Sequence, residues 1–167
     1  MFVRTKEIKG KKYAYLVRNK WVDGKVKQQV KKYLGKVYSP ERADETHFYE
    51  HYPSYGKRDP PEVIRDIVRL ELVNHGFAIL DDKTLSKADV IVDVAKCKVR
   101  TKNGKNAVLS WNDSFLHNSN FKKLVNFKIE KDEEEDTPGT RLAEAFSEAG
   151  INVDKEIFVQ LYKNIYL

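Results

Sequence analysis

The first 38 residues alternate between apolar and polar side chains in a way that is typical of short antiparallel strands. The pattern predicts three strands, at residues 2–8, 12–22 and 25–34. Asp23-Gly24 stands between the second and third strands, and this pair strongly favours a two-residue hairpin turn because both positions tolerate a positive φ. Gly10 marks the first turn and Gly35 closes the unit. We therefore predict a three-stranded antiparallel meander over residues 1–38.

The third strand of this meander has two chemically different faces. Valine and leucine alternate with lysine and glutamine, which predicts one buried face and one face in solvent. The expected buried residues are Val26, Val30 and Leu34, and the expected exposed residues are Lys25, Lys27, Gln29 and Lys31. A segment this short forms a poor core by itself. We therefore expect it to pack on the residues that follow.

After the meander, the chain predicts helices mixed with short strands. Ser39 as N-cap and Pro40 at the first helical position predict a helix that Pro53 ends. A second helix is expected between Asp59 and Gly76. The remaining expected elements are a buried strand at 77–80, a β-hairpin formed by 88–100 and 106–111 with a bulge near Ala95, and helices at 119–127, 140–150 and 154–167.

These elements predict an α+β protein. Its expected segments are a basic β-meander (1–38), a short helix with a linker (39–58), a central α/β region with a β-hairpin (59–129), an acidic linker (130–139) and a C-terminal helical pair (140–167). The last helix carries the stripe Phe158, Tyr162 and Tyr166 beside three aliphatic residues. A stripe this wide is expected to be buried, either in this chain's core or in a partner, including a second copy of the chain.

The positive charge of the protein is concentrated in the meander. The net charge is +6, but residues 1–38 contain 12 Lys and Arg against two acids, or 12 − 2 = +10. The other residues contain 31 − 12 = 19 bases and 25 − 2 = 23 acids, or −4. This asymmetry is typical of a phosphate-binding module joined to an acidic body. The alternative is a lysine-rich surface adapted to high temperature.

Composition limits the class of protein. A hydrophobic content of 41% supports a folded core, and no apolar run is long enough to span a membrane. The first residues are charged where a signal peptide would be apolar. Cys97 is the single cysteine, so no internal disulfide can form. These features predict a cytoplasmic protein with no membrane partner.

One motif raises the question of a metallopeptidase. His47 to His51 read HFYEH, which matches the H-x-x-E-H pattern in which two imidazoles one turn apart bind zinc and Glu50 acts as the base. However, Pro53 ends the predicted helix almost at once, and no third ligand can be assigned. We therefore predict a surface or packing role, with no metal and no cofactor.

A second enzymatic hypothesis concerns the central region. A helix with Glu71, followed by a strand with Asp89 and Asp93 and a hairpin, has the order of elements of restriction-endonuclease-like nucleases. Their acid-x-lysine motif is replaced here by Ser110-Trp111-Asn112. We therefore assign no catalytic residues and keep a diverged metal-dependent nuclease as an alternative.

The basic strands are the favoured functional site. Their lysines can contact phosphates, and the interleaved aromatic residues Tyr13, Tyr15, Trp21 and Tyr33 can contact bases, unless these rings face the core. The predicted nucleic-acid-binding residues are Lys11, Lys12, Arg18, Lys20, Lys25, Lys27 and Lys31.

The meander also resembles the N-terminal segment of DDE-type insertion-sequence transposases. Such proteins open with a strand, a GKxYxYLV run, a DGKV(R/K)Q turn and a closing LG. The matching residues are Gly10, Lys11, Tyr13, Tyr15, Leu16, Val17, Asp23, Gly24, Lys25, Val26, Gln28, Leu34 and Gly35. This resemblance implies a role near DNA and a relation to mobile elements.

The sequence therefore predicts a non-catalytic accessory or regulatory protein that binds nucleic acid, DNA rather than RNA, through a basic sheet face. The alternatives are the diverged nuclease and a protein-interaction module that acts through the C-terminal aromatic helix.

Overall fold

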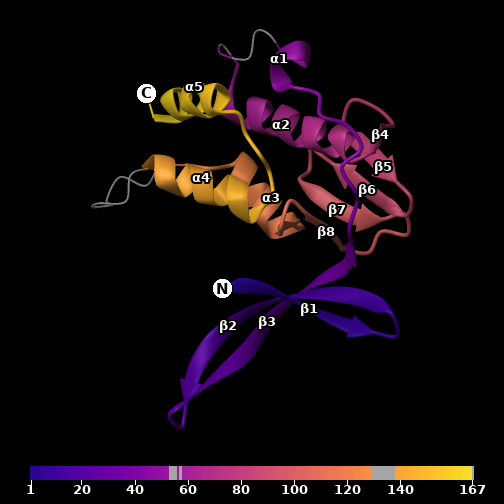
Figure 1. The fold of residues 1–167 in the computed structure, drawn as a ribbon, viewed down its shortest axis with the longest axis vertical. Helices are drawn as coiled ribbons and strands as arrows, with labels where there is room; N and C mark the ends of the chain where they lie inside the picture. The colour runs from indigo at the N-terminus through magenta and orange to yellow at the C-terminus, as the bar shows by residue number, and fades with distance from the viewer. Residues whose placement is uncertain (53–55, 57, 129–137, 167) are drawn as a thin grey trace.

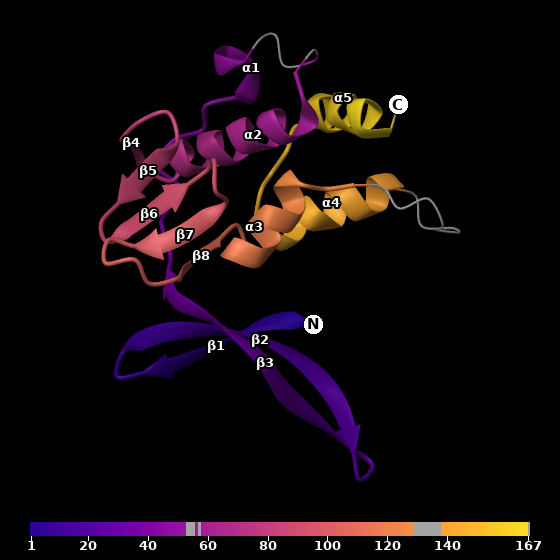
Figure 2. The same ribbon diagram turned by 180° about the vertical axis from the view of Figure 1, so that it is seen from behind.

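A computed structural model of the chain describes residues 1–52, 56, 58–128 and 138–166. It confirms an α+β fold, in which a mixed layer of helices and a small sheet lies above an extended N-terminal sheet (Figures 1 and 2). The helices are α1 (Phe48–His51), α2 (Pro60–Asn74), α3 (Asn118–Val125), α4 (Pro138–Glu148) and α5 (Lys155–Tyr166).

The strands form two sheets. The first has the order β1-β2-β3-β8-β9 and contains β1 (Phe2–Ile8), β2 (Lys11–Val22), β3 (Lys25–Tyr38), β8 (Ala107–Trp111) and β9 (Ser114–Leu116). The second is antiparallel, in the order β4-β5-β6-β7, and contains β4 (Ala78–Ile79), β5 (Thr84–Lys87), β6 (Val90–Asp93) and β7 (Lys98–Thr101). The predicted N-terminal meander is thus confirmed, with a third strand longer than expected.

The far half of the meander projects away from the helical body as a two-stranded ribbon (Figures 1 and 2). β1 pairs with β2 only as far as Val17, and β3 has no neighbour on its other edge until Lys36 pairs with β8. We call residues 18–30, which lie at and beyond the Val17–Val30 pair, the β2–β3 ribbon. Its turn is formed by Asp23 and Gly24, whose φ angles of 52° and 72° confirm the predicted hairpin.

The meander joins the body through a short parallel seam. Lys36, Val37 and Tyr38 pair with Ala107, Val108 and Leu109. Ala14, Leu34 and Val108 form a small separate core under this seam. Gly35 lies beside it with a φ of +143°, and a Cβ at that position would lie 2.5 Å from the carbonyl oxygen of Asn106. The absence of a side chain at this residue therefore allows the two backbones to approach.

The main core lies in the body. The inner face of α2 packs with residues of β5–β9 and of all three later helices, as shown by a single cluster of buried apolar side chains that includes Leu72, Val92, Leu109 and Phe121. Ile157 and Leu161 of α5 belong to this cluster, with Phe158 and Tyr162 partly buried against it. The aromatic stripe of the last helix therefore contributes mainly to this chain's own core, and Tyr166 alone of the three aromatic residues is exposed.

The predicted burial of Val26 and Val30 is wrong. Their exposed fractions are 51% and 60%, because this part of β3 belongs to the projecting ribbon, which no described element of the body covers (Figure 1). Leu34, at the base of the strand, is buried as predicted. From Lys25 to Val30 the alternation identified the two faces of the strand, but it did not show that both would be exposed.

The predicted helix after Ser39 is also wrong, because only Phe48–His51 are helical in this region. Instead, the backbone N–H groups of Ala43 and Asp44 donate to the carbonyl oxygen of Asn74, and the Asn74 side chain bonds both backbone groups of Thr46. These bonds hold the segment across the end of α2, so its backbone groups are not available for a helical ladder.

The central strands differ from the prediction in their connections. Residues 88–100 form two strands, β6 and β7, and the expected bulge near Ala95 is a turn that ends at Cys97 with a φ of 54°. β8 pairs with β3 and β9 rather than forming a hairpin with β7. The isolated bridge Arg100–Asn106 and the bond from the Thr101 N–H to the Lys105 carbonyl oxygen connect β7 to the residues just before β8. The expected strand 77–80 is reduced to Ala78–Ile79, which is exposed, and only Phe77 of that stretch is buried.

The four longer helices agree better with the sequence. α2 and α3 are found where they were predicted, and α4 and α5 match the expected C-terminal helices. α4 contacts α3 and α5 contacts α2. Of the acidic linker, residues 130–137 lie outside the described residues. Among the described helices, none is long and apolar enough to cross a membrane.

Candidate nucleic-acid interface

The register of the hairpin assigns each side chain of the β2–β3 ribbon to a face. Residues paired across two antiparallel strands point to the same side of the sheet. Arg18 pairs with Gln29, Lys20 with Lys27, and Val22 with Lys25. The Arg18 guanidinium donates to the Gln29 side chain over 3.1 Å, which agrees with this assignment. We call the side that carries Arg18, Lys20, Lys25 and Lys27 the basic face.

The remaining predicted binding residues are distributed differently. Lys12 is on the same side of β2 as the basic face, but it lies nearer the body and pairs with Glu7 of β1. Lys11 lies on the opposite side. Lys31 is the extra residue of a β-bulge, between the pairs Leu16–Lys32 and Val17–Val30. The expectation that Lys31 continues the regular alternation of Lys25 and Lys27 is therefore wrong.

The bulge also brings in a residue that sequence reasoning missed. By strict alternation Lys32 would lie on the buried side with Val30 and Leu34, but the extra residue shifts the register and pairs Lys32 with Leu16. Lys32 is exposed, and its ammonium group lies 3.5 Å from the Ser119 hydroxyl oxygen of α3. In the sequence, this bulge is indicated by two consecutive lysines, Lys31 and Lys32, which interrupt the alternation of the strand.

The cations of the basic face have no acidic partners among the residues that the structure describes. The ion pairs among the described residues involve Arg42, Arg58 and His75, and none involves a lysine or arginine of residues 1–38. Arg18, Lys20, Lys25 and Lys27 are all exposed. Four like charges on one side of a narrow ribbon create a local positive potential that can attract a polyanion.

The opposite side of the ribbon is apolar and aromatic. Within the ribbon, Trp21 pairs with Val26 on this side. The same side of the sheet continues toward the body with the pairs Val17–Val30 and Tyr15–Tyr33, of which Val17 is buried. The rings of Tyr15 and Tyr33 have centroids 5.3 Å apart. Trp21 lies next to the turn with 73% of its surface exposed. We call this side, with its continuation toward the body, the aromatic face; the prediction had assigned its Val26 and Val30 to a core.

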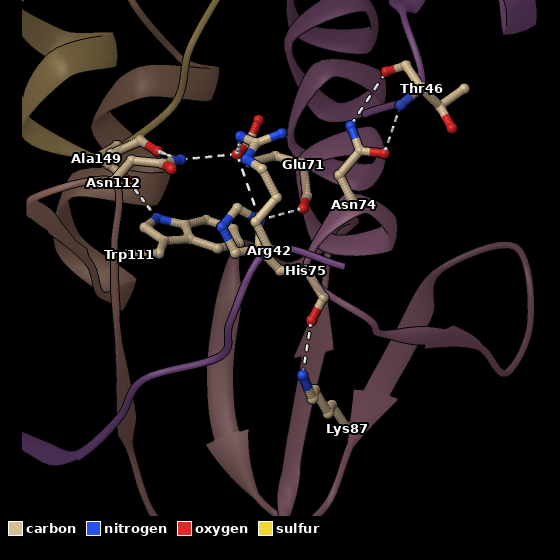
Figure 3. Close-up of polar contacts among 10 residues, drawn as sticks. Arg42, Thr46, Glu71, Asn74, His75, Lys87, Trp111, Asn112 and Ala149 are labelled. Carbon is tan, nitrogen blue, oxygen red and sulfur yellow. Dashed lines mark hydrogen bonds and ion pairs between the residues drawn. The ribbon is translucent and has the colours of Figure 1, made fainter. Parts of the chain in front are cut away.

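A second polar cluster lies in the body, around the buried Glu71 of α2 (Figure 3). The Glu71 carboxylate accepts hydrogen bonds from the Arg42 guanidinium at 2.6 Å and from the Asn112 side-chain amide at 2.7 Å. His75, also buried, lies one turn along the helix with its Nδ1 atom 3.4 Å from the carboxylate, and its ring lies 4.9 Å from that of Trp111. The cluster therefore connects the segment before α1, the helix α2 and the β8–β9 turn.

The geometry of this cluster differs from the expected nuclease site. Asp93 accepts a bond from the Lys96 backbone N–H, and Asp89 accepts one from the Tyr38 hydroxyl, so neither carboxylate bonds to the group around Glu71. Within the part of the chain that the structure describes, no three His, Cys, Asp or Glu side chains are grouped so that they could hold a metal ion.

The HFYEH motif also lacks the geometry of a metal centre. His47 is the N-cap of α1, with an extended backbone, and the helix then makes a single turn. His47 and His51 are exposed, and Phe48 is the residue that this turn buries. The motif thus packs the Phe48 side chain into the core of the body.

The chemistry of Glu71 leads to a stability prediction. Arg42 and Asn112 both donate to the same carboxylate oxygen, Oε1. Replacing Glu71 with glutamine keeps one acceptor oxygen for these donors but removes the negative charge that strengthens both bonds. We expect the free energy of unfolding to fall by roughly 2 kcal/mol, the range for a hydrogen bond to a charged group. Urea denaturation should be compared with Glu62→Gln, an exposed glutamate on the same helix, for which the loss should stay within about 0.5 kcal/mol. Equal losses in both variants would contradict a structural role for the cluster.

Comparisons of the chain with models of protein families, with curated proteins and with solved structures find no match.

Proposed function

We propose that the chain binds DNA without catalysis, as an accessory or regulatory protein, through the basic face of the β2–β3 ribbon. The observation that carries this proposal is the set of exposed cations on one side of a projecting ribbon, with no acidic partner among the described residues. Positive charge that no internal acid neutralises is available for phosphate groups.

The shape of the ribbon supports the same proposal. The major groove of B-DNA is wide enough to admit a two-stranded β-ribbon. The ribbon extends clear of the body, so its strands can approach a duplex without a collision between the DNA and the helices (Figures 1 and 2). The resemblance of the meander to the terminal segment of transposases favours DNA over RNA and a function related to mobile elements. In this proposal the chain acts in the cytoplasm and needs no cofactor.

The test is the salt dependence of binding. Each phosphate neutralised on duplex DNA contributes about −0.9 to the slope of log K against log salt, so the four cations should give a slope between about −3 and −4. Changing Lys20, Lys25 and Lys27 to glutamine should flatten this slope by up to about three units. Fluorescence anisotropy with labelled duplex DNA, measured across a salt series, gives the slope for each variant.

A matched control separates a local surface from overall charge. Lys96, Lys102 and Lys105 are exposed residues of the body, and changing these three to glutamine removes the same charge. This control should leave the slope within about half a unit of wild type, because its lysines lie outside the ribbon. Equal effects of the two triple variants, or binding of wild type no tighter than the weak non-specific range, would refute the proposal. Parallel titrations with single-stranded RNA test the preference for DNA.

A further inference from the structure

The aromatic face of the ribbon is unusually apolar for an exposed surface. Trp21, Val26 and Val30 are exposed by 73%, 51% and 60%, and Tyr33 by 49%. Side chains of this size are normally buried in a core, and their grouping on one exposed surface is typical of an interaction site. Phosphate binding by the basic face therefore gives no role to these apolar side chains.

Cations and hydrogen-bonding groups are interleaved with these rings. On β1, Arg4 and Lys6 pair with Tyr15 and Tyr13, so their side chains lie on the aromatic side of the sheet. Arg4 donates to the side chain of Gln28, which connects β1 to the ribbon on this side. Ring faces alternating with positive charges are the arrangement by which proteins bind unpaired bases and their phosphates.

We propose that the aromatic face binds unpaired bases of DNA, with Trp21 as the principal stacking residue. The inference rests on the proposed DNA-binding function and adds that the ligand has single-stranded character. Two observations favour bases as the occupant over a second copy of this chain. The meander carries a net charge of +10, so two copies would repel each other at this surface, whereas a polyanion would be attracted. Arg4 and Lys6 would also become buried between two copies without acidic partners.

Trp21 lies where a single nucleic-acid strand could contact both faces of the ribbon. Trp21 and Val26 form the cross-strand pair between Lys20–Lys27 and Val22–Lys25, close to the turn. A ribbon of two strands is narrow, since neighbouring strands lie only about 5 Å apart. Nucleotides at the end of a duplex or in a single strand can therefore stack on Trp21 while the lysines of the adjacent pairs contact phosphates.

The experiment compares a single-stranded oligonucleotide with a blunt duplex of the same length. Trp21→Ala should weaken binding of the single strand by about tenfold, the effect expected from the loss of one base–aromatic stack, and should change duplex binding by less than about twofold. Trp21→Phe should restore most of the affinity, because the stacking surface is kept. Tyr166→Ala, which removes an exposed ring at the end of α5, is the control and should have no effect.

Tryptophan fluorescence supplies a second readout. The protein has two tryptophans, and Trp111 is buried with 4% of its surface exposed. Quenching by the single strand should therefore come from Trp21 and should be lost in Trp21→Ala. A duplex with an unpaired overhang should quench like the single strand if the ligand is the end of a duplex.

The outcomes distinguish this inference from the proposed function. If Trp21→Ala leaves single-strand binding unchanged while the lysine variant flattens the salt slope on duplex DNA, the inference fails and the function stands. If light scattering shows a dimer of the wild type that Trp21→Ala converts to a monomer, the aromatic face binds a second copy and the inference is refuted. If wild type binds none of the DNA ligands, both are refuted.

Discussion

Replacing Gly35 with alanine is expected to lower the free energy of unfolding by about 3 kcal/mol or more. Its φ of +143° lies in a region that residues with a Cβ adopt only with strain of roughly 1–3 kcal/mol. The new Cβ would also lie 2.5 Å from the Asn106 carbonyl oxygen and 3.0 Å from the Ala107 Cα. These are backbone atoms of the segment that enters β8, so relief requires the two strands to separate. The seam that joins the meander to the body should therefore weaken.

Gly24→Ala is the matched control for Gly35→Ala. Gly24 also has a positive φ, of +72°, but a Cβ there would meet no atom within 4 Å. The free energy of unfolding of Gly24→Ala should be lower than that of wild type by about 1 kcal/mol, the cost of an ordinary residue in the left-handed region. Urea denaturation followed by circular dichroism measures both values. Equal losses would mean that the close approach at Gly35 contributes nothing.

Stability is expected to fall by roughly 3 kcal/mol between pH 6.5 and pH 4 through the single residue His117. Burial, and then the positive charge of Lys32, lower the pKa of His117 from 6.5 to about 4. Each unit of difference corresponds to about 1.4 kcal/mol. The unfolded chain takes up the proton near pH 6.5 and the folded chain only near pH 4, so the stabilisation is complete above pH 6.5 and is lost as the pH falls through that interval.

The environment of His117 explains why its neutral form is preferred. The residue is the N-cap of α3, and its Nδ1 atom accepts from the backbone N–H of Asn120. In a protonated ring both nitrogens carry hydrogen, so neither can accept the Asn120 bond. The ring would also place a positive charge at the positive end of the helix dipole. Proton uptake therefore removes the cap as well as charging a buried group.

His117→Asn isolates this contribution, since asparagine is a good N-cap and does not titrate. The carboxylates that also titrate in this range remain in both proteins. The stability of wild type relative to the variant should therefore decrease by roughly 3 kcal/mol from pH 7 to pH 4. A difference that is constant over this range would show that His117 does not control the acid sensitivity.

The sequence predicted the elements whose signals are local. The Asp23-Gly24 turn, the α2 helix with its stop at Gly76 and the short α3 helix all depend on residues close together in the chain. Helix caps and two-residue turns are encoded in this way, because the groups that bond are only a few residues apart. The basic character of the meander was likewise visible in the composition.

The elements that the sequence did not predict depend on distant partners. β3 pairs with β8 across about seventy residues, and nothing in either strand specifies the other. The helix expected after Ser39 is replaced by bonds to Asn74, a partner at the far end of α2. The prediction that Val26 and Val30 are buried was wrong for the same reason, since alternation defines a face of a strand but not what covers that face.

The bare edges of the β2–β3 ribbon have a consequence for the solubility of the chain. Beyond Val17 on one strand and before Lys36 on the other, the edges carry rows of backbone donors and acceptors that no described strand satisfies. Such edges are templates for aggregation, and natural proteins protect them with charged residues, lysine above all. The lysines of the ribbon therefore also act as gatekeepers against edge-to-edge assembly. Evolution cannot remove them one after another to adjust the affinity for DNA without also exposing a β-edge that recruits further copies of the chain.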